Sequence, residues 1–298
     1  MRLALPLLIG LLALLAPPVQ SQVARGTVQE GLTIDSQILG REVRYTVYLP
    51  YDYETSARAY PVVYLLHGYG DDDTGWVQFG EAHLIADEGI AQREIPPMIL
   101  VTPDAATSWY INNHDGTVRF EDFFIEEFMP HVEAQFRIRA ERRYRGVAGL
   151  SMGGFGALVY GLRHPDRFAA VAAFSPAVYT AETVATHPPE RWDNVERVVY
   201  GPALGTDRLT DHWRSYNPIE MITTATDEQR DAFRRVRLYM DSGDDDFLYK
   251  GVATFHIALR DHEVAHEFRV RDGGHRWSYW RSGLLAGLRF IGTSFHQP

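Results

Sequence analysis

The sequence contains no cysteine among its 298 residues. It can form no disulfide in any compartment, so its stability has to come from packing. Basic residues are also in the minority, because 29 lysines and arginines face 39 aspartates and glutamates and give a formal charge of −10. Such a chain repels phosphate backbones and anionic lipid, so we expect no nucleic-acid partner. The remaining composition, 45% hydrophobic and 23% charged, is globular and excludes disorder, collagen and coiled coil.

One apolar run stands at the start of the chain. Residues 3–16 are uncharged and apolar, follow Met1 and Arg2, and are succeeded by Val19-Gln20-Ser21. As a helix the run would span about 21 Å, short of the roughly 30 Å of a bilayer's hydrocarbon core, which argues against the alternative of a membrane anchor. The pattern predicts a signal peptide over residues 1–21 and a secreted or periplasmic mature protein that is not held at a membrane.

Strand-like and helix-like segments alternate along the rest of the chain, which we expect to form a single catalytic domain over residues 22–298. Two strands are predicted within residues 31–50, and further strands at 61–66, 98–102, 144–150, 168–174, 236–240 and 267–271. Helices are predicted at 81–94, 121–136, 152–162, 250–260 and 278–290. This alternation implies crossover connections and an α/β fold with a mainly parallel sheet. Residues 176–235 show no clean periodicity, so we interpret them as an insertion over the sheet edge.

A G-x-S-x-G sequence occupies Gly149–Gly153, between an apolar strand and a helix. This is the context of a nucleophile elbow, in which a serine is exposed at a sharp strand-to-helix turn. The turn strains the serine backbone, and the residues two positions away crowd each other unless they lack a Cβ. We therefore predict Ser151 as a nucleophile, with the positive N-terminal end of the next helix beneath it.

A serine nucleophile needs a base, which follows an acid in the chain order of this class of site. His275 follows the last predicted strand on a glycine-rich loop, so its imidazole is expected to project over the sheet. Other histidines lack that position, since His67 precedes the serine and His131 falls inside a helix. His275 is therefore the predicted base.

The acid is expected after the strand at 236–240, in a loop with four aspartates. Asp246 is favoured because it follows Gly243 by three residues and precedes Phe247-Leu248, which we expect to anchor the loop. Asp245 remains the alternative. The other aspartates of the loop are expected to be solvated.

Several spaced segments resemble one known family. They are LLHGYG at 65–70, SWY at 108–110, GLSMGGFGAL at 149–158, SGDDDFL at 242–248 and GGHRWSYW at 273–280. Together they resemble the esterase D and feruloyl esterase group of the α/β-hydrolase superfamily, similar to carbohydrate esterase family one. Relatives include xylan acetyl- and feruloyl-esterases, S-formylglutathione hydrolases and mycolyltransferases. The likeness covers roughly residues 30–292.

The resemblance implies an α/β-hydrolase fold and an acyl-enzyme mechanism without a cofactor or metal. By position, Ser151 corresponds to the nucleophile, His275 to the general base and Asp246 to the acid that orients it. The backbone N–H groups of Tyr69 and Met152 correspond to the oxyanion hole. The same triad also serves acyl transfer, so an acyltransferase of the mycolyltransferase type is an alternative.

Two other motifs suggest metal sites. His262–His266 is an H-E-x-x-H string, which on a helix would place His262 and His266 on one face for zinc, with Glu263 as base. The alternation of Phe268 and Val270 with charged residues indicates a strand there, with the preceding helix ended at Asp261. The acidic trios Asp71–Asp73 and Asp244–Asp246 lack calcium-loop spacing, and we expect solvated loops instead.

Aromatic residues gather near the loops expected at the catalytic edge. Candidates for the substrate pocket are Trp109, Tyr110, Trp277 and Trp280, whose faces could stack on a phenolic acyl group or a sugar ring. A secreted address favours an extracellular ester, such as a feruloyl or acetyl group on plant polysaccharide, by analogy with the resembled group. An alternative function with the same fold is that of a ligand-binding domain without catalysis. The presence of candidates for all three triad residues argues against it.

Overall fold

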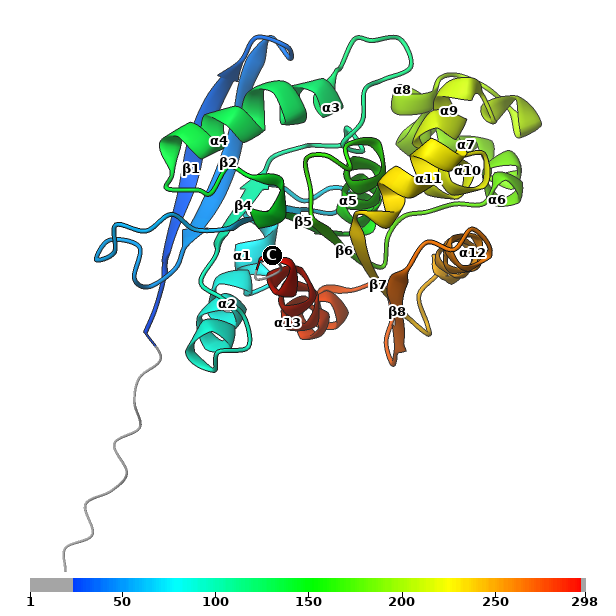
Figure 1. The fold of residues 1–298 in the computed structure, drawn as a ribbon. Coiled ribbons are helices and arrows are strands. Elements are labelled where there is room, and N and C mark those ends of the chain that lie inside the picture. The colour runs from blue at the N-terminus through cyan, green and yellow to red at the C-terminus, as the bar shows by residue number, and fades with distance from the viewer. Residues whose placement is uncertain (1–23, 296–298) are drawn as a thin grey trace, which may run out of the picture.

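A computed structural model describes residues 24–295, so the predicted signal peptide at 1–21 lies outside the described residues. One sheet of eight strands runs through the molecule in the order β1-β2-β4-β3-β5-β6-β7-β8, and helices cover both of its faces (Figure 1). The strands are β1 Thr27–Ser36, β2 Arg41–Leu49, β3 Val62–Leu66, β4 Ile99–Pro103, β5 Arg145–Leu150, β6 Ala170–Phe174, β7 Arg237–Gly243 and β8 His266–Arg271. The strands β1 and β2 pair antiparallel, and β2 also pairs antiparallel with β4. The remaining neighbours, in the order β4, β3, β5, β6, β7 and β8, pair parallel. The predicted mainly parallel α/β sheet is confirmed.

Two apolar layers hold helices against the sheet. One layer packs α4 (Met129–Gln135), α5 (Ser151–Arg163) and α12 (Tyr249–Asp261) on one face. The other packs α2 (Ala82–Ala91) and α13 (Trp277–Ser294) on the opposite face. The central strands β3, β4, β5 and β6 are buried along their whole length because helices cover them on both sides, which explains their continuous apolar sequences.

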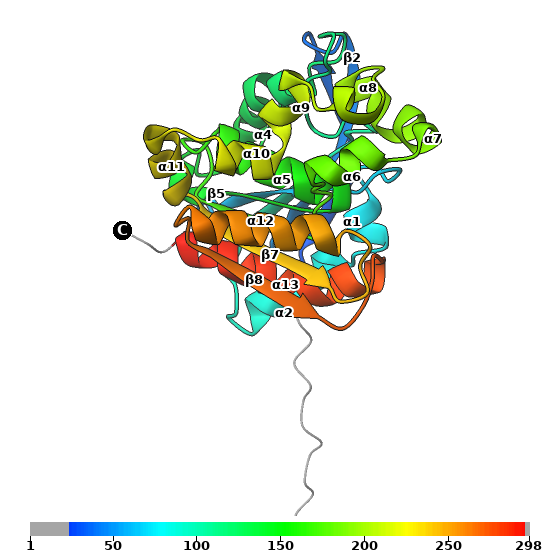
Figure 2. The same cartoon turned by 90° about the vertical axis from the view of Figure 1, so that its right-hand side faces the viewer.

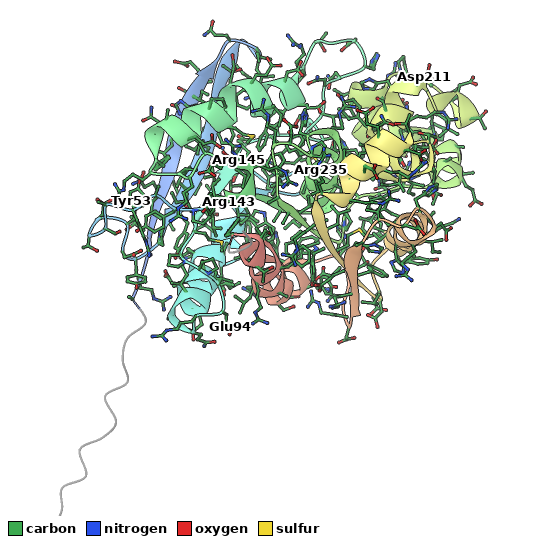
Figure 3. The ribbon with its side chains drawn as sticks, in the orientation of Figure 1. Tyr53, Glu94, Arg143, Arg145, Asp211 and Arg235 are labelled. Atoms are coloured by element: carbon green, nitrogen blue, oxygen red, sulfur yellow. The ribbon has the colours of Figure 1, made fainter. Side chains whose placement is uncertain are left out.

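An ion pair joins the helical segment before β5 to the start of that strand. Short helices α1 (Gly75–Gln78) and α3 (Phe120–Asp122) and the π-helix η1 (Phe123–Phe128) precede α4, and the turn η2 (Arg142–Tyr144) precedes β5. Arg145, labelled in Figure 3, donates hydrogen bonds of 2.5 and 2.8 Å to the carboxylate of Glu133 in α4. This half-buried pair fixes α4 against the amino end of β5.

The interval at 176–235 is helical, which the sequence did not predict. It contains α6 Ala181–Thr186, α7 Pro189–Arg191, the π-helix η3 Trp192–Glu196, α8 Arg197–Tyr200, the turn η4 Gly205–Arg208, α9 Asp211–Tyr216, α10 Pro218–Thr223 and α11 Asp227–Arg234. Figure 2 shows these elements on the α5 side of the sheet, above α12. None exceeds eight residues, so none repeats an apolar stripe often enough to be recognised.

Parallel strands end at a common edge, and this edge gathers the predicted site. The loops after β3, β5, β7 and β8 carry Tyr69, Ser151, Asp246 and His275 respectively. Among residues 24–295, no helix combines the length and apolar character needed to cross a bilayer.

Candidate active site

Ser151 lies at the point where β5 ends and α5 begins, with a left-handed backbone φ of 51°. A Cβ at Gly149 would lie 2.3 Å from the carbonyl oxygen of Gly153, and one at Gly153 would lie 2.3 Å from that of Leu66. Both positions therefore require glycine, for the steric reason that the motif indicates. The tight turn exposes the serine hydroxyl at the sheet edge.

Three side chains from distant parts of the chain form a hydrogen-bonded series. The Oγ of Ser151 lies 2.9 Å from Nε2 of His275, and Nδ1 of His275 lies 2.9 Å from Oδ2 of Asp246. An ionised carboxylate can only accept, so Nδ1 of the imidazole carries the hydrogen and donates it to Asp246. Nε2 is then free to accept the hydrogen bond of the serine hydroxyl, which is the arrangement a general base requires.

The carboxylate of Asp246 is buried, with 1% of the residue exposed. Burial would raise its pKa, yet hydrogen bonds from His275 and from the Leu248 backbone N–H, which lies 2.9 Å away, bring the pKa below its ordinary value. Asp246 is therefore ionised beside the imidazole. The neighbouring Asp245 is exposed, so the structure places the favoured aspartate, and not the alternative, against His275.

The loop after β3 reaches the nucleophile. A Cβ added to Gly68 would lie 3.8 Å from the Cβ of Ser151, and Tyr69 follows immediately in the chain. Met152 is the second residue of α5, where backbone N–H groups have no partner within the helix. The two predicted oxyanion-hole residues thus lie on either side of Ser151, Tyr69 in the loop after β3 and Met152 in the first turn of α5.

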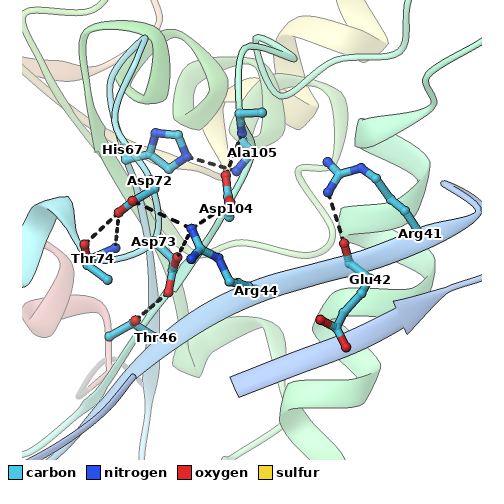
Figure 4. Close-up of polar contacts among 11 residues, drawn as sticks. Arg41, Glu42, Arg44, Thr46, His67, Asp72, Asp73, Thr74, Asp104 and Ala105 are labelled. Carbon is cyan, nitrogen blue, oxygen red and sulfur yellow. Dashed lines mark hydrogen bonds and ion pairs between the residues drawn. The ribbon is translucent and has the colours of Figure 1, made fainter. Parts of the chain in front are cut away.

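An ionic cluster holds the continuation of this loop (Figure 4). Arg44 of β2 lies 3.7, 3.5 and 3.4 Å from carboxylate oxygens of Asp72, Asp73 and Asp104. Asp73 is 1% exposed and accepts a 2.7 Å hydrogen bond from the hydroxyl of Thr46. The expectation that Asp71–Asp73 form a solvated loop was wrong for Asp73, because this side chain turns inward to β2.

His67 stiffens the start of the same loop. It is completely buried, and burial lowers its pKa, so the ring is neutral. Its Nε2 accepts a 2.9 Å hydrogen bond from the Ala105 N–H (Figure 4). Its Nδ1 lies 2.8 Å from the carbonyl oxygen of Gly68. The hydroxyl of Tyr110 donates a 3.1 Å bond to the His67 carbonyl.

Tyr110 has no exposed surface and packs edge-on against Phe120 and Tyr160. It therefore belongs to the core, which corrects its prediction as a pocket residue. Trp109 is 3% exposed, and its indole N–H donates a 3.2 Å hydrogen bond to the carbonyl oxygen of Val195. Its role is also mainly to pack, because little of its face remains accessible.

The two C-terminal tryptophans lie behind the imidazole. Trp280 is 6% exposed, and its ring centroid lies 4.9 Å from that of His275 in an edge-on arrangement. Trp277 is half-buried and packs edge-on against Trp280 and Trp76. These contacts fix the loop that carries His275.

Phe247 was predicted as an anchor of the loop, and the structure corrects this role. It is 63% exposed, and its ring centroid lies 4.7 Å from that of His275. The expected anchor of the loop is Leu248 alone, which is 2% exposed.

The H-E-x-x-H string does not form a helical pair. The helix α12 ends at Asp261, as predicted, and Glu263 has a left-handed φ of 56°. His266 lies in β8, where its Nε2 is 2.7 Å from Nδ1 of His256. Within residues 24–295, no three His, Asp or Glu side chains cluster in a way that could hold a metal ion.

The fold agrees with comparisons to known proteins. The family "Esterase", described as "Putative esterase", matches residues 36–291. This chain belongs to that esterase family. The predicted resemblance to the feruloyl esterase group is confirmed, and the fold is that of the α/β-hydrolases.

Individual relatives support the same placement. An esterase of Mycobacterium tuberculosis is 33% identical over 273 residues, which cover 82% of this chain and 56% of that protein. An endo-1,4-beta-xylanase/feruloyl esterase of Xylanibacter ruminicola is 33% identical over 55% of this chain and 24% of that protein. The chain thus spans about half the length, or less, of these curated relatives. The solved structure of a ferulic acid esterase is 34% identical, covers 91% of this chain and 99% of its own, and superposes with a TM-score of 0.78.

Proposed function

We propose that this chain is a secreted serine esterase that hydrolyses feruloyl, acetyl or other short acyl esters, such as those on plant polysaccharides. The observation that carries the proposal is the series from Ser151 through His275 to Asp246, with both links at 2.9 Å. Ser151, His275 and Asp246 are assigned as nucleophile, general base and orienting acid.

The reaction follows from this geometry. The Oγ of Ser151 attacks the ester carbonyl while its proton passes to Nε2 of His275. The backbone N–H groups of Tyr69 and Met152 stabilise the negative charge on the carbonyl oxygen. The tetrahedral intermediate then breaks its bond to the alcohol, which takes the proton from Nε2 and leaves. Water repeats the sequence on the acyl-enzyme, releases the acid and restores the serine.

The proposed substrate class depends on similarity to named esterases and on the predicted signal peptide. Two relatives carry feruloyl or ferulic acid esterase in their names, and a third, 24% identical over 77% of this chain, is an acetyl esterase of Caldicellulosiruptor saccharolyticus. The predicted signal peptide favours an ester outside the cell over a cytosolic one. Exposed aromatic surface at Tyr69 and Phe247 offers faces for a phenolic or sugar ring.

The test is a comparison of Ser151→Ala with the parent enzyme on methyl ferulate, acetylated xylan and 4-nitrophenyl acetate. We expect loss of turnover by at least about a thousandfold with an unchanged circular dichroism spectrum. Ser278→Ala, at an exposed serine of α13, is the matched control and is expected to keep parental activity. A fluorophosphonate should label the parent but not Ser151→Ala. Parental activity in Ser151→Ala would overturn the proposal.

A further inference from the structure

A cavity of about 430 Å³ opens between the helical insertion and the start of α12. Its walls include Tyr179 and Arg191 from the insertion and Phe247 and Lys250 from the segment after the triad acid. Phe247 also contacts the His275 ring, with centroids 4.7 Å apart, so one wall of the cavity lies next to the catalytic base. Its volume lies within the range of small-molecule sites and can hold a sugar ring.

The cavity wall is rich in positive charge and hydrogen-bond donors. Nη2 of Arg191 donates a 2.7 Å hydrogen bond to the hydroxyl oxygen of Tyr179, which leaves the phenolic proton free to be donated elsewhere. Lys250 carries a second cation at the wall, where it pairs with the exposed carboxylate of Glu182 at 2.6 Å. Arg191 also lies 3.3 Å from a carboxyl oxygen of the buried Glu196.

The first turn of α12 adds to this polarity. Tyr249, Lys250 and Gly251 are the first three residues of a helix of 13 residues, and all three line the cavity. The N-terminal end of a helix carries partial positive charge, which favours an anion beside it. The helix end and the two cations therefore all favour an anion in the cavity, in a protein whose overall charge is −10.

The place of this cavity next to His275 indicates which part of an ester would lie in it. The proton held on Nε2 has to be given to the leaving alcohol, so the alcohol lies on the histidine side of the scissile carbonyl. Phe247 and Tyr249 are 63% and 62% exposed, and their faces suit the C–H surface of a sugar ring.

We propose that this cavity binds the alcohol part of the substrate as a sugar that carries a carboxylate, of the glucuronate type, with Arg191 and Lys250 as its cationic partners. The inference rests on the proposed function and deepens it, because it names the leaving alcohol. Tyr179 donates to the same carboxylate or to a neighbouring hydroxyl, and the exposed aromatic rings bind the face of the sugar.

The experiment compares kcat/KM for two substrates with the same acyl group, acetylated glucuronate and acetylated glucose, with 4-nitrophenyl acetate as a reference ester. We expect the parent enzyme to prefer the glucuronate ester by about tenfold, as for one charge-assisted hydrogen bond. Arg191→Gln and Lys250→Gln should each reduce this preference severalfold, whereas Arg191→Lys should retain most of it. The matched control is Arg197→Gln, a half-exposed arginine on the same insertion that pairs with Asp193 and does not line the cavity.

A direct binding measurement separates the cavity from the chemistry. Titration of free glucuronate into Ser151→Ala should show saturable binding that weakens when Arg191→Gln is added. Equal kcat/KM for the two sugar esters, or a preference that survives both Arg191→Gln and Lys250→Gln, would overturn the inference. So would a preference for 4-nitrophenyl hemisuccinate that depends on Arg191, since the cavity would then bind the acyl group. Absence of parental turnover on 4-nitrophenyl acetate would instead refute the proposed function itself.

Discussion

The hydroxyl of Tyr69 donates a 3.1 Å hydrogen bond to the backbone carbonyl of Asn194. Tyr69 belongs to the loop that meets the nucleophile, and Asn194 lies in the π-helix η3 of the insertion, 125 residues away. Trp109 donates to the next carbonyl, that of Val195. Two aromatic side chains thus donate to consecutive backbone carbonyls of the insertion, which ties this segment to the loops after β3 and β4.

Removal of the Tyr69 hydroxyl should loosen the loop that supplies one oxyanion donor. In Tyr69→Phe the ring remains, but the bond to Asn194 is lost, and we expect kcat to fall about fivefold, as for one hydrogen bond of roughly 1 kcal/mol. KM should change less, because the N–H of residue 69 acts mainly in the transition state. Steady-state kinetics on 4-nitrophenyl acetate measure both parameters. Tyr51→Phe, at an exposed tyrosine of another cavity, is the control, and an unchanged kcat in Tyr69→Phe would contradict a positioning role.

The two adjacent aspartates of the acidic loop should differ sharply. Asp246→Asn removes the acceptor that holds Nδ1–H of His275, so we expect kcat to fall by about a thousandfold or more. Asp245→Asn changes an exposed side chain next to it and should leave kcat within about twofold. Thermal unfolding of both variants shows whether a lower kcat results from a loss of stability. Similar losses in the two variants would contradict the assignment of the triad acid.

The catalytic edge was predictable where the signal is local in sequence. The strand, the glycines and the helix around Ser151 are contiguous, so the turn could be recognised before any tertiary contact was known. Chain order and strand ends then restricted the base to His275 and the acid to one loop, in which Asp246 was favoured and Asp245 remained the alternative.

Side-chain direction in the neighbouring loops was not predictable. Trp109 and Tyr110 both have left-handed backbone angles, with φ of 56° and 62°, so the usual alternation of sides does not apply to them. The helices of the insertion were not predicted because they are too short for an apolar period. A usable signal was the capping box in which Thr226 and Gln229 exchange hydrogen bonds at the start of α11.

The Glu263 carboxylate should be dispensable. In a zinc hydrolase with an H-E-x-x-H helix this residue would be the general base, and its loss would abolish turnover. Here its side chain is 88% exposed and follows the end of α12. We therefore expect Glu263→Gln to keep kcat/KM within about twofold of the parent, as for an ordinary surface change. A large loss of ester hydrolysis, with EDTA sensitivity in the parent, would restore the metal hypothesis.

A buried carboxyl group in the insertion should make stability fall with rising pH. Glu196 is 2% exposed, and burial, only partly offset by Arg191 and Arg208, raises its pKa from 4.5 to about 7. His187 lies 3.6 Å from Glu196 and is itself neutral above about pH 4, because burial lowers its pKa. Other groups that face this carboxyl are the phenols of Tyr179 and Tyr200.

Between pH 4.5 and 7 the folded state holds a proton on Glu196 that the unfolded chain has released, so the free energy of unfolding decreases as pH rises. The full effect, from a shift of this size, is at most about 3 kcal/mol. Glu196→Gln removes the titration, so its melting temperature relative to the parent should be higher at pH 8 than at pH 5. Melting curves of both proteins across this range test the sign, and the comparison cancels the contribution of His187 to first order. Glu228→Gln, an exposed residue of α11, is the control, and a constant difference between Glu196→Gln and parent would show that Glu196 is ionised throughout.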